Sequence, residues 1–355
     1  MRGAGTVQQI STPPVASSAF LQSAGLANVC YVSKGGSDTT GTRGSIAKPF
    51  LTIAAAMAAS QAGDVIVLGP GRWTENVALL ENRSIVGSGP QASEINGTLS
   101  QTPGATSTNN RVTLAAFRLT GAATVTLTAK TGGDNLFSLN DLILEQTLTL
   151  TRATNGKKEA YLDGVIVGST LTTNFGKIHA AGCEIAALAL TSAAGGEHWR
   201  FYGCSIINAT IASAQGTTRF VGCTVTGSIT HSDTYLGDSL IYTTGCELTA
   251  ATITISGGIW YEFGCTLDQS QVAGASGNKR ISFQRIARAT YPNGTTTVTL
   301  PVALGATEYV VCLEYNSLAG GANACYVANK TATTFDVVNG GDPEDITIGV
   351  FYRKP

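Results

Sequence analysis

Five tetrapeptides of the form Gly-Cys-x-aliphatic recur at similar intervals between residues 182 and 267. Thiols at a regular spacing can form disulfides, bind a metal, act as nucleophiles or pack as small apolar side chains. A zinc site requires ligands that converge tetrahedrally, and the sequence has no Cys-x-x-Cys motif or Cys/His cluster to supply them. A nucleophilic thiol requires a neighbouring base and partial exposure. The five cysteines are Cys183, Cys204, Cys223, Cys246 and Cys265.

The position of these cysteines is shared by larger apolar residues upstream. Phe117, Leu142 and Val165 stand in the same frame. We therefore interpret cysteine as one occupant of an inward-facing apolar column and predict a buried structural ladder of thiols. Stacked Cβ atoms would stay near the strand spacing of about 4.8 Å, whereas a disulfide prefers about 3.8 Å, so we expect free thiols. No metal site and no cofactor is predicted.

Two aromatic segments, EHWRFYGC and GIWYEFGC, precede ladder cysteines and offer a second kind of chemistry. Exposed Trp and Tyr rings can stack on sugar rings, and charged neighbours can add hydrogen bonds. The candidates for contact with a glycan or receptor are Trp199, Arg200, Tyr202, Trp260, Tyr261 and Glu262. The interpretation that we favour is that these rings pack within the protein or against a neighbouring subunit.

The acidic residues give no readable catalytic pair. A glycosidase requires two carboxyl groups about 5–10 Å apart. Glu184 and Glu247 occupy the same position of the repeat but lie three repeats apart, and Asp141, Asp163 and Glu145 form no convincing pair. We therefore predict no catalytic residue and interpret these acids as solvated face or turn residues.

The cysteine frame extends into a repeat of about 20 residues that covers most of the chain. The residue two places after the cysteine position is aliphatic in every repeat, and the residue between them is mostly polar. This alternation with period two predicts strands with one buried face. The aliphatic column contains Leu119, Leu144, Val167, Ile185, Ile206, Val225, Leu248 and Leu267. A second apolar column contains Val125, Leu148, Leu171, Leu190, Ile211, Ile229, Ile253 and Val272.

Short strands, Gly/Asn/Thr turns and a variable repeat length predict a parallel β-solenoid in which each repeat is one coil. Residues 1–28 are polar and read as an N-terminal arm or linker, and residues 29–280 form the parallel β-helix. Within it we expect a helix at 50–60 and a buried strand at 65–68. The repeat stops at residue 281, and we expect a C-terminal β-sandwich domain at 281–355 with strands at 296–300, 309–315, 334–338 and 345–352.

Composition excludes several classes of function. The formal net charge is −1, only 13% of residues are charged, and no cluster of Lys and Arg marks a nucleic-acid surface. The sequence has no apolar stretch of about 18 residues, so we expect no membrane insertion. The N-terminus lacks a continuous apolar core, so we expect no cleavable signal peptide.

Two regions resemble known proteins. Tyr31-Val32, Gly36-Ser37-Asp38 and residues 49–53, 63–66 and 71–75 resemble the entry of right-handed parallel β-helix proteins of the pectin-lyase-like superfamily. The segments TVTLPVALGATEYVVCLEYN, TATTFDVVN and DITIGVFYRKP look like the small β-domains that end phage tail fibres and tailspikes. The resemblance implies an all-β chain: a right-handed parallel β-helix with an N-terminal capping helix, followed by a small antiparallel β-sandwich.

The resemblance also implies a function. Such proteins are fibres or spikes of a virion that attach to a host surface, usually as homotrimers. We therefore expect this chain to associate with itself, with other virion proteins and with a host surface glycan or protein. It would reside in the virion after synthesis in the host cytoplasm. The alternatives are a tailspike enzyme that degrades polysaccharide as a lyase or hydrolase, with acids shared between subunits, and a secreted bacterial adhesin.

Overall fold

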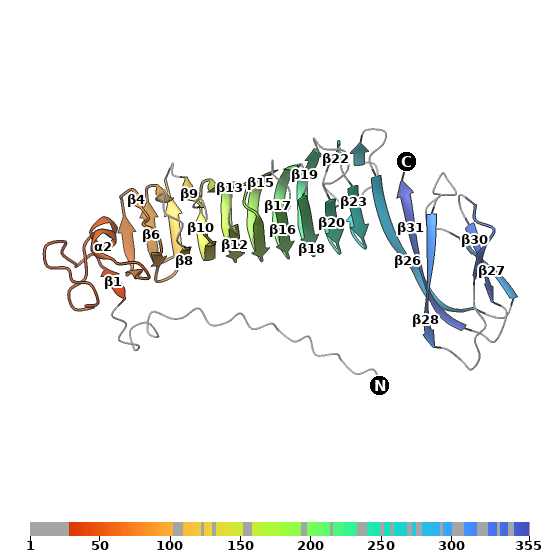
Figure 1. Ribbon diagram of the computed structural model, residues 1–355, viewed down its shortest axis with the longest axis horizontal. Coiled ribbons are helices and arrows are strands. Elements are labelled where there is room, and N and C mark those ends of the chain that lie inside the picture. Colours follow the sequence, from red (N-terminus) through yellow and green to blue (C-terminus); the bar gives the residue numbers. More distant parts are fainter. Residues whose placement is uncertain are drawn as a thin grey trace.

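The computed structural model shows a long stack of parallel strands followed by antiparallel strands (Figure 1). It describes residues 28–101, 109–121, 124–129, 133–151, 158–192, 197–213, 216–232, 240–248, 252–256, 259–267, 272–274, 279–291, 294–299, 309–317, 326–331, 334–339 and 344–354. The expected fold class is confirmed: the described chain is mostly β, with a parallel β-solenoid and one short helix. The expected arm at 1–28 lies, apart from Asn28, outside the described residues. The described residues contain no helix that is long and apolar enough to cross a membrane.

The parallel pairings between coils form three ladders, which we call faces 1, 2 and 3, and several long strands pass from one face to the next. Face 1 consists of β1 (Val29–Val32), β2 (Val65–Leu68), β5 (Ser84–Val86), the first parts of β8 (Asn110–Thr120) and β10 (Asn135–Leu144), β12 (Lys158–Asp163), β14 (Lys177–Ala181), β16 (Glu197–Tyr202), β18 (Gly216–Val221), β20 (Leu240–Thr244) and β23 (Ile259–Phe263).

Face 2 consists of β3 (Gly71–Trp73), β6 (Ser93–Asn96), the ends of β8 and β10, the starts of β13 (Ile166–Thr173), β15 (Glu184–Ser192), β17 (Ser205–Ser213) and β19 (Thr224–Ser232), β21 (Glu247–Leu248) and β24 (Thr266–Leu267). Face 3 consists of β4 (Val77–Ala78), β7 (Leu99–Gln101), β9 (Val125–Thr128), β11 (Leu148–Thr151), the ends of β13, β15, β17 and β19, β22 (Thr252–Ile255) and β25 (Val272–Gly274).

The register on face 2 confirms the columns expected from the cysteine frame. Phe117 lies opposite Leu142, and Leu119 lies opposite Leu144. The residue between these two positions, which is polar in most coils, forms a third column. Its register is unbroken through Ile166, Glu184, Ser205, Thr224, Glu247 and Thr266. Like residues on successive coils of face 2 therefore stack at the spacing predicted from the repeat.

The prediction of the second apolar column was wrong in two coils. Leu171 lies opposite Leu188, which lies opposite Ala209, whereas Leu190 and Ile211 stand two residues further along the strand. The register slips between faces 2 and 3, where one coil has a residue more than its neighbour. Because Ala209 is a small side chain, it did not stand out as a core position, although it is fully buried.

The corner between faces 1 and 2 explains the glycine of each Gly-Cys pair. The residue before the cysteine position has a positive φ in every coil from residue 116 to residue 264, which is a left-handed backbone that glycine adopts without a Cβ clash. These corner residues are Ala116, Asp141, Gly164, Gly182, Gly203, Gly222, Gly245 and Gly264, with φ values from 50° to 61°. Glycine turns the chain, and the next residue then points into the core.

The first coil is closed by the helix α2 (Ile53–Ala59), which is shorter than the 50–60 segment expected. Thr52 caps it by accepting a hydrogen bond from the N–H of Ala55 (3.1 Å). The Glu75 carboxylate accepts from the N–H groups of Ile53 and Ala54, both at 2.9 Å. The free donors of the first turn are thus satisfied by residues of the resemblance motif.

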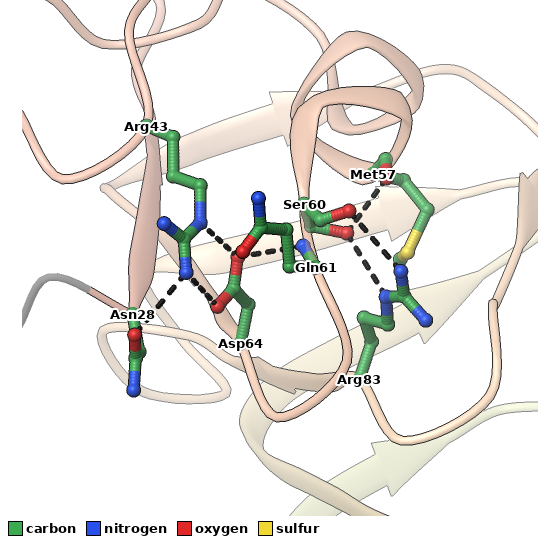
Figure 2. A network of polar contacts seen from close by, with 7 residues as sticks. All are labelled: Asn28, Arg43, Met57, Ser60, Gln61, Asp64 and Arg83. Carbon is green, nitrogen blue, oxygen red and sulfur yellow. Dashed lines mark hydrogen bonds and ion pairs between the residues drawn. The ribbon is translucent and has the colours of Figure 1, made fainter.

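A polar network connects the segment between α2 and β2 with Arg43 and Asn28 (Figure 2). Arg43 donates two hydrogen bonds to the buried carboxylate of Asp64, at 2.6 and 2.7 Å, and a third to Asn28. The N–H of Gln61 also donates to Asp64 (2.8 Å). These contacts lower the pKa of Asp64, chiefly through the bond from Arg43 and against the opposing effect of burial.

The C-terminal strands continue the solenoid. The strand β26 (Lys279–Tyr291) pairs in parallel with β23 at its start and antiparallel with β31 (Glu344–Lys354) over most of its length. β28 (Tyr309–Ser317) pairs with β31, and a second antiparallel sheet has the order β27 (Gly294–Thr299), β30 (Thr334–Asn339) and β29 (Tyr326–Ala328). All four expected strands are present, although Leu300 lies outside the described residues, and the expected boundary at 280/281 falls inside β26.

Candidate functional site

The five ladder thiols follow the corner between faces 1 and 2. Four of them are at most 2% exposed, and Cys265 is half-buried. Each of the four buried thiols donates to a backbone carbonyl two residues before it and to one in the preceding coil; Cys223, for example, contacts the oxygens of Val221 (3.6 Å) and Phe201 (3.3 Å). All five are free cysteines. The sulfurs therefore pack as small apolar groups with weak hydrogen bonds to the corner carbonyls.

The contacts between successive thiols shift their pKa values in alternating directions. Hydrogen bonding to Cys204, followed by burial, raises the pKa of Cys183, and contacts with both neighbours raise that of Cys223. The same contacts lower the pKa of Cys204 and Cys246, because a thiolate there would accept S–H bonds from the coils on either side. Burial opposes ionisation at every member, Cys204 and Cys246 included, and the described column contains no Lys, Arg or His to stabilise a thiolate, so we describe the ladder as neutral thiols.

Three of the six residues considered for glycan contact point into the core. Trp199 and Trp260 are at most 1% exposed, and their indole N–H groups donate to the carbonyl of Phe175 (2.8 Å) and the hydroxyl of Thr243 (3.0 Å). Glu262 is also buried. Because residues alternate between the two sides of a strand, an inward Trp260 places Glu262 inward and Tyr261 outward. Stacking of either indole on a sugar from solvent is therefore ruled out, in favour of packing within the coil.

The other three lie on the outer side of face 1. Tyr202 is 41% exposed, and Arg200 and Tyr261 are partly exposed. Arg200 and Tyr261 belong to one column that runs through six successive coils, which we call the face-1 strip. Its members in order are Tyr161, His179, Arg200, Arg219, Tyr242 and Tyr261.

Contacts between neighbours hold the strip in place. The rings of Tyr161 and His179 stack at 4.9 Å with 8° between their planes, and those of Tyr242 and Tyr261 stack at 4.8 Å with 9°. The guanidinium of Arg219 lies 5.1 Å from the ring centroid of Tyr242, in a cation–π contact. The strip is therefore a preformed ladder of rings and guanidinium groups on rigid strands.

The middle of the strip is positively charged. The described outward side chains of β16, β18 and β20 include no carboxylate, and no ion pair of Arg200 or Arg219 is found within the described part of the chain. Glu159, at the N-terminal end, is bound to Lys177 (2.8 Å). Burial, and then the charge of Arg200, lower the pKa of His179.

Sequence reasoning missed four members of the strip, although a signal for them exists. Every member stands four residues before the cysteine position of its coil, from Tyr161 before Val165 to Tyr261 before Cys265. Extending the column alignment backwards by one strand would have found it. The sequence pattern favours the two indoles because tryptophan is the strongest aromatic signal. Each indole, however, stands one residue before the strip member of its strand and therefore faces inward.

The acids remain scattered in the structure. Glu184 and Glu247 project from face 2, separated in the polar column by Ser205 and Thr224. Asp141 occupies a corner, and Glu145 is bound to Arg118. Among the residues that the structure describes, no group of three or more His, Cys, Asp or Glu side chains is placed to hold a metal ion.

No protein-family model and no curated protein matches this chain in sequence. The fold and the strip are therefore the observations from which function is argued.

Proposed function

We propose that this chain is a fibre or spike protein of a virion, and that it attaches to a host surface glycan through the face-1 strip. The observation that carries the proposal is the strip itself: six ring or guanidinium side chains in consecutive coils of a rigid rod. An extended binding surface on stacked repeats is how solenoid proteins usually recognise ligands.

The fold supports this proposal. A parallel β-solenoid followed by antiparallel strands is the arrangement that the resemblance to tail fibres and tailspikes predicts. The strip is made of side chains locked by their neighbours, so little conformational entropy is lost when a ligand binds. Attachment requires such a surface, and catalysis would require in addition a pair of acids.

We further propose that the protein assembles as a homotrimer, as the resemblance implies. Face 3 offers a surface for self-association, since its outward column contains no charged residue from Ser100 to Thr254. Its members in order are Ser100, Thr126, Thr149, Thr172, Ala189, Thr210, Thr230 and Thr254. Light scattering on the purified chain tests this, and a monomer at working concentration would contradict it.

Attachment is tested by binding the full chain to an array of neutral and acidic surface glycans. We expect saturable binding that the double substitution Arg219→Ala/Tyr242→Ala abolishes. The matched control is Ser205→Ala/Thr224→Ala, which alters the outward column of face 2 and should leave binding unchanged. Absence of binding to every glycan, or equal binding by the strip variant, would contradict the proposal.

A further inference from the structure

Stacked rings of the strip cover one face of each other, and Tyr242 is covered on both faces. Arg219, from the preceding coil, lies over one side of Tyr242, and Tyr261, from the following coil, stacks against the other. Tyr161 and His179 cover each other in the same way. A sugar ring therefore cannot lie flat on Tyr242, the ring beside the two arginines.

The strip instead presents hydrogen-bond donors and positive charge. Ring edges, phenol hydroxyls, an imidazole and two guanidinium groups point outward, and a guanidinium binds carboxylate, sulfate or phosphate through two parallel hydrogen bonds. Arg200 and Arg219 lie directly opposite each other on adjacent strands. Like charges in this position repel, so their juxtaposition is unfavourable for folding alone.

The surroundings do not neutralise this pair. Thr217 and Val221 flank Arg219, and His198 and Tyr202 flank Arg200. The nearest described acids on the outer side of face 1, Glu159 and Asp163, both stand on β12, two strands from Arg200. Glu159 is held by Lys177 and by the hydroxyl of Tyr161 (3.3 Å). Two guanidinium groups are thus left to bind an anion from outside the described chain.

We propose that the face-1 strip binds an anionic polysaccharide that lies along the rod, with its carboxylate or sulfate groups held by Arg200 and Arg219. This inference rests on the proposed attachment function and names the chemical class of the glycan. The stacked tyrosines at the C-terminal end contribute hydroxyl groups to the same ligand and keep Arg219 in place through its contact with Tyr242.

The geometry disfavours a nucleic acid as the ligand. Proteins that bind single strands do so by stacking bases on exposed aromatic faces, whereas both faces of Tyr242 and one face of each other ring in the strip are occupied. Duplex binding relies on many phosphate contacts, whereas the middle of the strip has two arginines and the chain has a net charge of −1.

The test measures binding of the full chain to four probes by biolayer interferometry: polygalacturonate, dextran sulfate, dextran and oligothymidylate. The two polyanions separate carboxylate from sulfate, and dextran is the neutral reference. The double variant Arg200→Gln/Arg219→Gln removes the charge pair. The control Arg72→Gln/Arg111→Gln removes the same charge from exposed arginines outside the strip.

We expect the native chain to bind at least one polyanion and not dextran, with binding that weakens as salt is raised. The strip variant should lose about tenfold or more in affinity, because charge-assisted hydrogen bonds are lost, and the control should stay within about twofold. Equal losses in both variants, comparable binding of dextran, absence of polyanion binding, or tighter binding of oligothymidylate would overturn the inference. Binding of neutral array glycans that still depends on Arg219 and Tyr242 would overturn it while leaving the attachment function intact.

Discussion

At the scale of single residues, the corner between faces 1 and 2 depends on one left-handed residue per coil. Six of the eight corner positions are glycine, and Asp141 is an exposed exception with a φ of 50°. A left-handed conformation costs a residue with a Cβ about 1–2 kcal/mol. The same fold thus contains both relaxed and strained versions of one corner.

This contrast gives a prediction in both directions. Asp141→Gly should raise the free energy of unfolding by about 1 kcal/mol, and Gly203→Ala should lower it by a similar amount. A Cβ at Gly203 would meet nothing within 4 Å, so the effect is conformational and not a clash. Urea unfolding followed by circular dichroism measures both. No change in either variant would show that the corner does not limit stability.

The strip adds a prediction about pH. His179 faces Tyr161 and Glu159 on β12, Arg200 on β16 and Lys177 on its own strand, and burial followed by Arg200 lowers its pKa. A bound anion would favour the charged imidazolium, so binding must raise the pKa of His179. Affinity for a polyanion should then increase as pH falls below about 6.5. His179→Gln should remove this increase, and a pH-independent affinity of the native chain would contradict the linkage.

At the scale of elements, the sequence predicted the sheets better than it predicted the site. Face 2 could be aligned because each coil repeats glycine, cysteine and an aliphatic residue at fixed offsets, and a strand with one buried face has a period of two. The register shift before Leu188 and Ala209 was not predicted, because the corner between faces 2 and 3 varies in length. A corner with one residue more changes which residues of the next strand face inward. Side-chain direction on face 1 was assigned from residue type, and the buried Trp199 shows why periodicity is the safer guide.

The N-terminal cap is an element whose stability depends on one ion pair. Asp64 is almost fully buried and accepts two bonds from Arg43 and one from the N–H of Gln61. Asp64→Asn should lower the free energy of unfolding by about 2–3 kcal/mol at neutral pH, because charge-assisted hydrogen bonds are lost. Arg72→Gln, whose exposed pair with Glu94 is worth little, is the control.

The pH dependence of this variant follows from the pKa of Asp64. Because the folded state lowers that pKa, the carboxylate stabilises the native protein above the ordinary value of about 3.9, and this contribution is lost as pH falls through the lower, folded-state value. The difference between the native chain and Asp64→Asn should therefore shrink in acid. A difference that stays constant from neutral pH to strong acid would contradict the assignment.

At the scale of the whole molecule, the stack has to end without exposing a strand edge. At the N-terminal end, Val32 pairs with Phe50, and α2 with its loop covers the first coil (Figure 1). At the C-terminal end, β26 pairs in parallel with β23 and antiparallel with β31. The two ends are closed by different devices, a helical cap and a change of strand direction.

A rod of this kind is stabilised mainly by contacts between neighbouring coils, so damage at one end should remain local. Asp64→Asn weakens the N-terminal cap, and we expect faster amide hydrogen exchange in β1, β2 and β5 than in the native chain. Exchange in β18, β20 and β23 should stay close to native, because many intact coils separate them from the cap. Hydrogen exchange read by mass spectrometry resolves these strands. If protection fell equally along the whole solenoid, the coils would unfold as one cooperative unit, and the face-1 strip would then depend on the cap.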